Sequence, residues 1–262
     1  MLVDDGSTDG CGDIATSCAA SHPDKIRYIK SLGVVNQGTG PARNVGLSHA
    51  RGLYIAFLDS DDVWLPHALQ VMIEGLESHP ETGMVYGATN YWRQWPGSTS
   101  TRPDALDFNQ TRGVPPGTLV QPPGLLTYFL EDSGAVPCMC SILVRRNIAE
   151  QAGGFEDSFR GLYEDQAFYM KVALAAPVLV LGGYWANYRR HDDSIWETAM
   201  RQGEEDRARL YFLNWLTRYL QEMTVDNVDV WHALKAQLWP FKHPAARLDA
   251  RCAPYCAKRS AR

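Results

Sequence analysis

Short apolar runs and amphipathic segments alternate along most of the chain. Apolar runs bounded by glycine, proline or polar clusters are typical of buried strands, whereas apolar residues on one helical face indicate helices. On these patterns we expect strands at residues 26–29, 54–58, 84–91, 141–144 and 178–181. We expect helices at residues 13–20, 41–50, 66–77, 148–152, 164–175, 204–223 and 228–238. Strands that alternate with helices predict an α/β fold with a mainly parallel central sheet flanked by helices.

The pattern changes near residue 200, after which only helices are predicted. We therefore expect an α/β domain over residues 1–200 and a helical C-terminal extension with a basic tail over residues 201–262. From Lys235 to the end there are seven Lys and Arg residues and one acid, a formal charge of +6. Residues 95–124 are rich in Pro, Gly, Ser and Thr and predict a long loop, of the kind that forms lids or binding segments.

Composition and charge exclude several classes of protein. The chain has 262 residues, of which 45% are hydrophobic and 21% charged, so a globular fold is expected rather than disorder. Its net charge of −5 argues against a general nucleic-acid binder, and no apolar run is long enough to cross a bilayer. The cysteines lack zinc-ribbon spacing and no secretory signal is present, so we expect reduced thiols and a cytoplasmic protein.

The beginning of the chain is unusual for a sheet-forming domain. Met1-Leu2-Val3 has the pattern of the end of a strand and runs directly into the acidic loop Asp4-Asp5-Gly6-Ser7. A sheet rarely starts with half a strand, so we expect further residues upstream.

The most informative segment is residues 53–64, an apolar run that ends in Asp59-Ser60-Asp61-Asp62. Ligands of open parallel sheets bind beyond the carboxyl ends of the strands. Crowded carboxylates repel one another unless a cation neutralises them, and oxygen ligands suit Mg²⁺ or Mn²⁺, which keep positions open for phosphate. The alternative is an acidic turn in which Asp61 or Asp62 caps a helix that starts near Pro66.

Two further sets of polar residues lie near the predicted ends of strands. Asp4 and Asp5 follow the first strand, where carboxylates can accept hydrogen bonds from a nucleotide base or ribose; a plain Asp-Gly turn is the alternative. Arg43 lies in the first turn of a predicted helix, where it can contact a phosphate or the base-binding loop. The alternative for Arg43 is a solvated side chain that pairs with a nearby acid.

The second half of the chain contains two more sets of candidate site residues. Glu164 and Asp165 open a predicted helix, where acids are favoured by the helix dipole whatever their role, and where one of them can act as a general base. His191 follows Arg189 and Arg190 after the last predicted strand. A neutral imidazole can complete a carboxylate metal site, although an exposed histidine in a polar turn is the commoner case.

In this order, the motifs resemble those of the family 2 glycosyltransferases, which have the nucleotide-sugar-binding GT-A fold. The resemblance extends from residue 3 to about residue 196. It lies in Val3-Asp4-Asp5-Gly6-Ser7-Thr8-Asp9-Gly10, Ala42-Arg43-Asn44-Val45-Gly46-Leu47, Phe57-Leu58-Asp59-Ser60-Asp61-Asp62, Gly153-Gly154-Phe155, Glu164-Asp165 and Tyr188-Arg189-Arg190-His191. It implies a GT-A-like domain that lacks the family's usual first strand and helix, which would expose a neighbouring strand edge.

The resemblance also implies roles at the nucleotide sugar. Asp5, with Asp4 as the alternative, is similar to the residue that recognises the nucleotide base. Asp59 resembles the first acid of the family's DXD motif, near the ribose and diphosphate. Arg43 joins this nucleotide-sugar-binding set through its place in the second matching segment.

The remaining roles concern the metal and the chemistry. Asp61 resembles the metal-binding acid of the DXD motif, His191 resembles the histidine that reaches the same ion, and Asp62 is a third acid able to support or replace Asp61. Asp165 resembles the catalytic base, with Glu164 beside it.

These observations predict an inverting glycosyltransferase that moves a sugar from a nucleotide-diphosphate sugar to a hydroxyl acceptor, assisted by Mg²⁺ or Mn²⁺. A glycan or lipid-linked acceptor in polysaccharide or glycolipid biosynthesis is expected, with no nucleic-acid partner. The alternative is a truncated, non-catalytic relative that binds a nucleotide or a partner protein. A nucleotidyltransferase is disfavoured because no glycine-rich phosphate loop with basic residues lies near the start.

Aromatic residues and the basic tail bear on acceptor and membrane contacts. Tyr91, Trp92, Trp95, Trp185 and Trp196 could stack on sugars, although core packing is the commoner role of tryptophan. The basic tail offers peripheral contact with the inner face of the membrane, against the simpler alternative of a solvated basic end.

Overall fold

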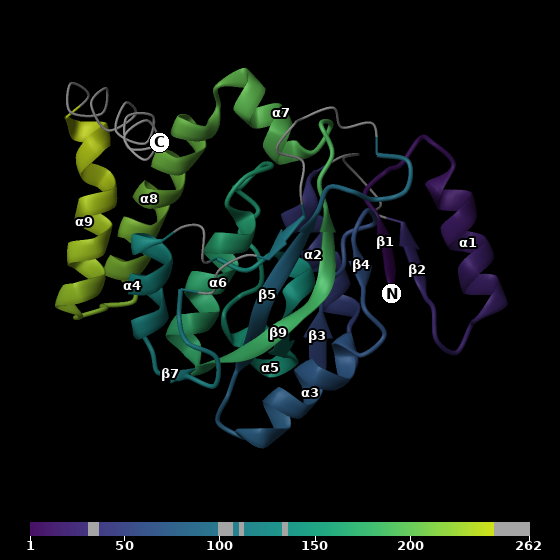
Figure 1. Cartoon of the computed structure of the whole chain (residues 1–262), viewed down its shortest axis with the longest axis horizontal. Coiled ribbons are helices and arrows are strands. Elements are labelled where there is room, and N and C mark those ends of the chain that lie inside the picture. The colour runs from purple at the N-terminus through teal and green to yellow at the C-terminus, as the bar shows by residue number, and fades with distance from the viewer. Residues whose placement is uncertain (31–36, 99–106, 110–112, 133–135, 244–262) are drawn as a thin grey trace, which may run out of the picture.

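The computed structural model describes residues 1–30, 37–98, 107–109, 113–132 and 136–243, and its centre is a seven-stranded sheet (Figure 1). The main path across this sheet is β3 (Tyr54–Ala56), β8 (Ile142–Arg145), β5 (Met84–Trp92), β9 (Val178–Arg189) and β4 (Val63–Trp64). Two short strands extend it: β6 (Phe108–Asn109) pairs with β5, and β7 (Leu119–Val120) pairs with β9.

The sheet is mixed. β5 and β9 are parallel, whereas β8 is antiparallel to both β3 and β5, and β4 is antiparallel to β9. The prediction of a mainly parallel sheet is therefore wrong, while the α/β class with flanking helices is confirmed. The reason is that strand direction depends on where the chain returns after each long connection, and the local hydrophobic pattern does not encode that return.

A second, smaller sheet contains β1 (Leu2–Asp4) and β2 (Tyr28–Lys30). These strands pair in parallel and are connected by α1 (Cys11–Ser21). Among the residues that the structure describes, β1 pairs with no strand besides β2, and β3 with none besides β8. Each of β1 and β3 thus keeps one edge without a strand partner, and such edges are open to further pairing.

The remaining helices surround the sheets. They are α2 (Thr39–His49), α3 (Ala68–Ser78), α4 (Gly124–Glu131), α5 (Arg146–Gln151), α6 (Glu164–Ala175), α7 (Ile195–Gln202), α8 (Glu205–Glu222) and α9 (Val228–Lys242). Figure 1 shows α8 and α9 beside α4 on one side of the main sheet, and α1, β1 and β2 on the opposite side.

Alternate residues of the central strand β5 face two different hydrophobic clusters, as expected for a strand covered on both faces. Met84 and Tyr86 belong to the larger cluster, which includes Phe168 of α6 and residues of α4, α8 and α9. Val85 belongs to the smaller cluster beneath α3. The helices beyond residue 200 therefore share a core with the α/β part, and a domain division at that point stays a prediction.

Most predicted elements are present, with shifted ends. The helix predicted over residues 164–175 is α6, whereas the last predicted strand continues beyond residue 181 to Arg189. The predicted loop 95–124 contains β6 and β7, and α4 and α7 were not predicted. Parts of that loop, at 99–106 and 110–112, and the basic tail from residue 244 lie outside the described residues. No helix in the described ranges has the length and apolar character needed to cross a membrane.

Candidate active site

One cleft of about 1350 Å³ brings the predicted site residues together. It is bounded by β1, β3, α2, the start of α6 and the segment that follows β9. Of the residues predicted from sequence, it is lined by Asp4, Asp5, Arg43, Asp59, Asp61, Glu164, Asp165 and His191, and not by Asp62. Segments far apart in the sequence thus converge as the resemblance implies.

The acidic loop after β1 is folded around Asp4. The buried Asp4 carboxylate accepts hydrogen bonds from the Tyr28 hydroxyl (2.6 Å) and from the backbone N–H groups of Gly6 (3.0 Å) and Ser7 (2.7 Å). These bonds, with that of Tyr28 first, hold the pKa of Asp4 well below its usual range. Asp5 accepts one backbone N–H at the start of α2 (2.8 Å). Asp4 therefore shapes the loop, whereas Asp5 connects the loop to the start of α2 and lines the cleft.

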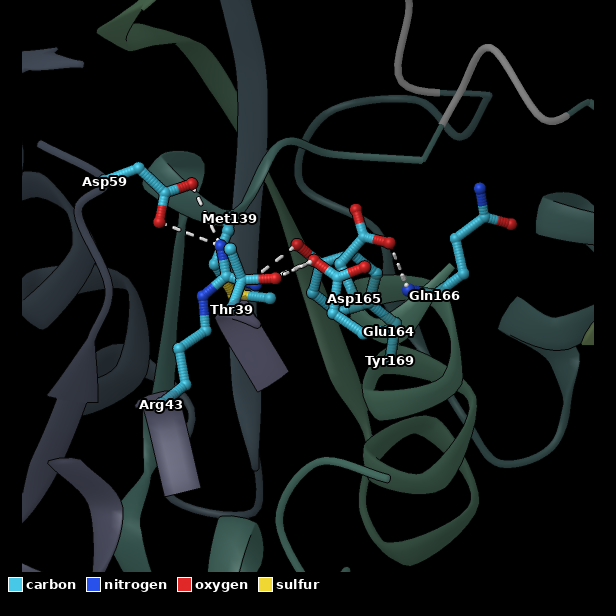
Figure 2. A network of polar contacts seen from close by, with 8 residues as sticks. All are labelled: Thr39, Arg43, Asp59, Met139, Glu164, Asp165, Gln166 and Tyr169. Carbon is cyan, nitrogen blue, oxygen red and sulfur yellow. Dashed lines mark hydrogen bonds and ion pairs between the residues drawn. The ribbon is translucent and has the colours of Figure 1, made fainter. Parts of the chain in front are cut away.

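Arg43 lies at the centre of a network of ion pairs (Figure 2). Its Nη2 donates to both oxygens of Asp59 (2.8 and 2.9 Å), and its Nη1 donates to Oε1 of Glu164 (3.1 Å). The Thr39 hydroxyl donates to the same Glu164 oxygen (2.9 Å). Because α2 begins at Thr39, Arg43 lies in its second turn. The prediction that Arg43 lies in the first turn of the helix is therefore wrong. The structure thus contains ion pairs with acids, as in the predicted alternative, but the Arg43 side chain is only 10% exposed and not solvated as that alternative has it.

At the acidic strand end, the Asp61 carboxylate lies 3.1 Å from Nε2 of His191. The two side chains are 43% and 30% exposed, so both are accessible from the cleft. A carboxylate beside an imidazole fits part of the ligand set of a divalent cation that takes its other ligands from phosphate and water. Within the described ranges, no three His, Cys, Asp or Glu side chains are grouped closely enough to hold an ion. An ion held by Asp61 and His191 would therefore need further ligands such as water or phosphate oxygens.

Asp62 does not join this pair, which corrects its predicted role as a metal ligand. Its N–H donates to the carbonyl of Asp59 (3.1 Å), closing a turn, and its Oδ1 accepts the backbone N–H of Arg189 on β9 (2.9 Å). The turn thus directs the Asp62 carboxylate into the protein, where it is buried. Burial raises the pKa of Asp62 to about 7.

The start of α6 has an unusual backbone. Tyr163, the residue before the helix, has a φ of 69°, in the left-handed region that few non-glycine residues adopt. Its ring stacks on Phe212 of α8, with the ring centroids 5.2 Å apart, and the guanidinium of Arg209 lies over it. The C-terminal helices therefore hold the backbone turn that leads into Glu164 and Asp165.

Glu164 and Asp165 have different environments although they are neighbours. Glu164 is buried against Arg43, whereas Asp165 is half-buried and accepts the backbone N–H of Gln166 (2.7 Å). Burial and the adjacent Glu164 charge raise the pKa of Asp165 to about 7, and Arg43 opposes this shift. An acid with such a pKa can take up and release a proton near neutral pH.

Sequence reasoning missed the contacts that join the motifs. Nδ2 of Asn44 donates to the carbonyl of Phe155 (2.9 Å), and its Oδ1 accepts the Phe155 N–H (2.8 Å). At Gly154, with a φ of 61°, an added Cβ would lie 2.5 Å from that Asn44 oxygen, so only glycine fits. Asn44 and Gly154 both lie in matching segments, but motif order does not tell which segments touch.

The predicted aromatic residues separate into two groups. Tyr91 and Trp196 line the cleft, and the Trp196 side chain is exposed there. Trp185 is buried in the core, while Trp92 and Trp95 lie against the guanidinium of an arginine at 5.4 and 4.8 Å. Trp196 is thus the tryptophan of this set that reaches the cleft with an exposed ring.

Known proteins resemble this chain in sequence over part of its length. An uncharacterized glycosyltransferase of Nostoc sp. (strain PCC 7120) is 43% identical over 86 residues, which are 33% of this chain and 26% of the relative. The chain thus spans about a quarter of the length of that relative.

Solved structures resemble it in fold over most of its length. The mannosyltransferase PcManGT from Pyrobaculum calidifontis, in complex with GDP-Man and Mn²⁺, has a TM-score of 0.57 at 18% identity, covering 98% of this chain and 68% of that one. TarS 1–349 of S. aureus, in complex with UDP-GlcNAc, has a TM-score of 0.53 at 18% identity, covering 90% and 69%. These likenesses confirm the predicted GT-A-like architecture.

The family itself is shown by the N-terminal half of the chain. A family model described as "Glycosyl transferase family 2" matches residues 1–135. This stretch contains the acidic loop, the Arg43 helix and the acidic strand end of the cleft. The chain belongs to glycosyl transferase family 2.

Proposed function

We propose that this chain is an inverting glycosyltransferase, which moves a sugar from a nucleotide-diphosphate sugar to a hydroxyl acceptor with the help of Mg²⁺ or Mn²⁺. The observation that carries the proposal is one cleft lined by two chemically different groups of residues, which we name its donor end (Asp5, Asp59, Asp61 and His191) and its base end (Glu164 and Asp165). Asp61 and His191 lie 3.1 Å apart at one end, and at the other Asp165 has a pKa raised to about 7. The first end suits a diphosphate with its cation, and the second suits a general base.

The donor end is formed by Asp5, Asp59, Asp61 and His191. Asp5 meets the nucleotide base, and Asp59 lies toward the ribose and diphosphate. The fold neighbours that hold UDP-GlcNAc and GDP-Man support a nucleotide sugar as donor. Asp61 and His191 would hold the cation, which when bound supplies positive charge to the departing diphosphate.

Asp165 acts on the acceptor. Its ionised carboxylate takes the proton of the acceptor hydroxyl while the hydroxyl oxygen attacks the anomeric carbon. The bond to the diphosphate breaks on the opposite face of the sugar, so a single displacement inverts the anomeric centre. Because protonation at Asp165 blocks the base, the rate should rise with pH through about 7.

The acceptor is proposed to be a glycan or a lipid-linked saccharide, in polysaccharide or glycolipid biosynthesis. The exposed ring of Trp196 on the cleft supports a sugar, since sugars stack on aromatic faces. We place the enzyme in the cytoplasm, with contact to the inner face of the membrane through the basic tail, of which Lys235 and Lys242 lie in α9.

Substitution of the base tests the proposal. Asp165→Asn should lower the transfer rate roughly 1000-fold, because general-base catalysis is lost. Binding of UDP or GDP in the presence of Mn²⁺, measured by calorimetry, should be unchanged. Asp229→Asn, in the first turn of α9 and outside the cleft, is the matched control and should keep full activity.

A normally active Asp165→Asn variant would exclude this residue as the base. Nucleotide binding by the native chain without transfer from any nucleotide sugar would favour the non-catalytic alternative.

A further inference from the structure

A buried arginine connects the two ends of the cleft (Figure 2). Resting on the function proposed above, we infer that Arg43 is a positioning residue: its guanidinium pairs at once with Asp59 of the donor end and with Glu164 beside the base. It would then act on catalysis through these carboxylates, and not by contact with the donor phosphate.

The contacts of Arg43 leave it little freedom to serve a ligand directly. Nη2 donates to both oxygens of Asp59, and Nη1 donates to Glu164, so both terminal nitrogens are engaged. The guanidinium lies over the Phe155 ring at 5.6 Å, and that ring stacks on Phe168 at 4.3 Å. The Arg43 side chain is 10% exposed. An arginine held by two carboxylates and an aromatic face is fixed in place.

The same contacts place a positive charge among three acids. Asp59, Glu164 and Asp165 all line the cleft around Arg43. Adjacent carboxylates disfavour each other's ionised form, whereas a nearby cation favours it. Arg43 is thus placed to offset the repulsion that Glu164 and Asp59 exert on Asp165.

Among the charges that act most strongly on Asp165, the positive one is Arg43. Arg190, His191 and Glu205 line the same cleft and Arg209 lies over the Tyr163 ring, but the largest charge effects on Asp165 are those of Glu164, Arg43 and Asp59. Cys138, Tyr163 and Tyr169 also lie in its electrostatic surroundings, and burial raises the pKa of the thiol and of both phenols, so all three are neutral near pH 7. Removal of Arg43 should therefore leave the base next to uncompensated negative charge.

The pH dependence of transfer and the titration of Asp165 test this inference together. Arg43→Met should shift the acidic limb of the kcat/KM profile upward by roughly one pH unit, which lowers the rate at pH 7 roughly fivefold. The ¹³C chemical shift of the Asp165 carboxyl should give the same shift in midpoint. Arg43→Lys keeps the positive charge, so the acidic limb of its kcat/KM profile should stay near that of the native protein. A single ammonium cannot reproduce the ion pairs with both Asp59 and Glu164.

A double variant separates charge from shape. Arg43→Met with Glu164→Gln removes one positive and one negative neighbour of Asp165, so the limb should return toward the native pH. Lys171→Met is the matched control, because Lys171 on α6 is buried and forms an ion pair with Glu156 (2.6 Å), and neither residue lines the cleft. Lys171→Met should lower the melting temperature and leave the pH of the acidic limb of the kcat/KM profile unchanged.

An equal loss of activity at every pH in Arg43→Met, with an unchanged Asp165 midpoint, would show a merely structural ion pair and overturn the inference. If Arg43→Met does not fold, Glu164→Gln alone is measured. It must lower the pH midpoint of the Asp165 titration, and an unchanged midpoint would again overturn the inference. If the native chain transfers no sugar, the proposed function fails, yet the carboxyl titration still decides the role of Arg43.

Discussion

The two ends of the cleft are built in different ways. At the donor end, the side chains of Asp59, Asp61 and His191 are 38%, 43% and 30% exposed. At the base end, the Glu164 side chain is 10% exposed, and α6 is anchored in the largest hydrophobic cluster. Under the proposed function, the end that exchanges a nucleotide and a cation at each turnover is open to solvent, whereas the end whose base keeps a raised pKa is partly buried.

The largest expected difference concerns stability. Phe168, on α6, is fully buried and contacts the rings of Phe57 and Phe155. Phe168→Ala should lower the free energy of unfolding by roughly 3–5 kcal/mol, because it leaves a cavity under the base. Leu58→Ala, next to the donor acids and 43% exposed, should change it by less than about 1 kcal/mol. Urea denaturation of both variants checks this contrast, and equal losses would contradict it.

The next largest effect concerns the cation. Asp61→Ala should weaken Mn²⁺-dependent binding of UDP or GDP roughly 100-fold, because it removes the charged member of the Asp61–His191 pair. The melting temperature should hardly change, since the side chain is 43% exposed. Calorimetry with and without Mn²⁺ measures both quantities. Binding that remains Mn²⁺-dependent at native affinity would move the cation site elsewhere.

The smallest effect separates Asp62 from its neighbour. In the folded protein the pKa of Asp62 is raised from its usual value of 3.8 to about 7, so folding favours the protonated acid. This acid therefore contributes its full stability at low pH and loses it as the pH rises from 3.8 through 7. Asp62→Asn should raise the free energy of unfolding by roughly 2 kcal/mol at pH 5.5 and leave it nearly unchanged near pH 3. Urea denaturation at the two pH values checks this sign, which a metal-binding Asp62 would not produce.

The sequence predicts those features that depend on neighbouring residues. The helix that starts at Glu164 is predicted with its bounds, because two acids follow a glycine-bearing loop at a helix start. The extent of β9 is not predicted, since its second half is defined by pairing with β4 and β5. Pairing between distant strands leaves only a weak local pattern.

The candidate site likewise has features that the sequence predicts and features that it does not. The residue types and their places along the chain predict an acidic cleft with a metal-binding end. They do not predict that Asp61 faces the cleft while Asp62 faces β9, because a turn between Asp59 and Asp62 decides this. Nor do they predict that Arg43 pairs with Glu164, 121 positions away in the sequence. Contacts of this range arise only when the whole fold is assembled.

Under the proposed function, the stacking of Tyr163 on Phe212 gives helix α8 a part in turnover. Helix α8 supplies no residue of the donor end or the base end, yet its Phe212 packs on Tyr163, which precedes Glu164 and the proposed base Asp165. Reshaping that packing should alter speed while leaving donor choice as it is. The rate of the proposed enzyme could therefore be changed, for an unchanged sugar nucleotide, by altering how α8 packs on Tyr163.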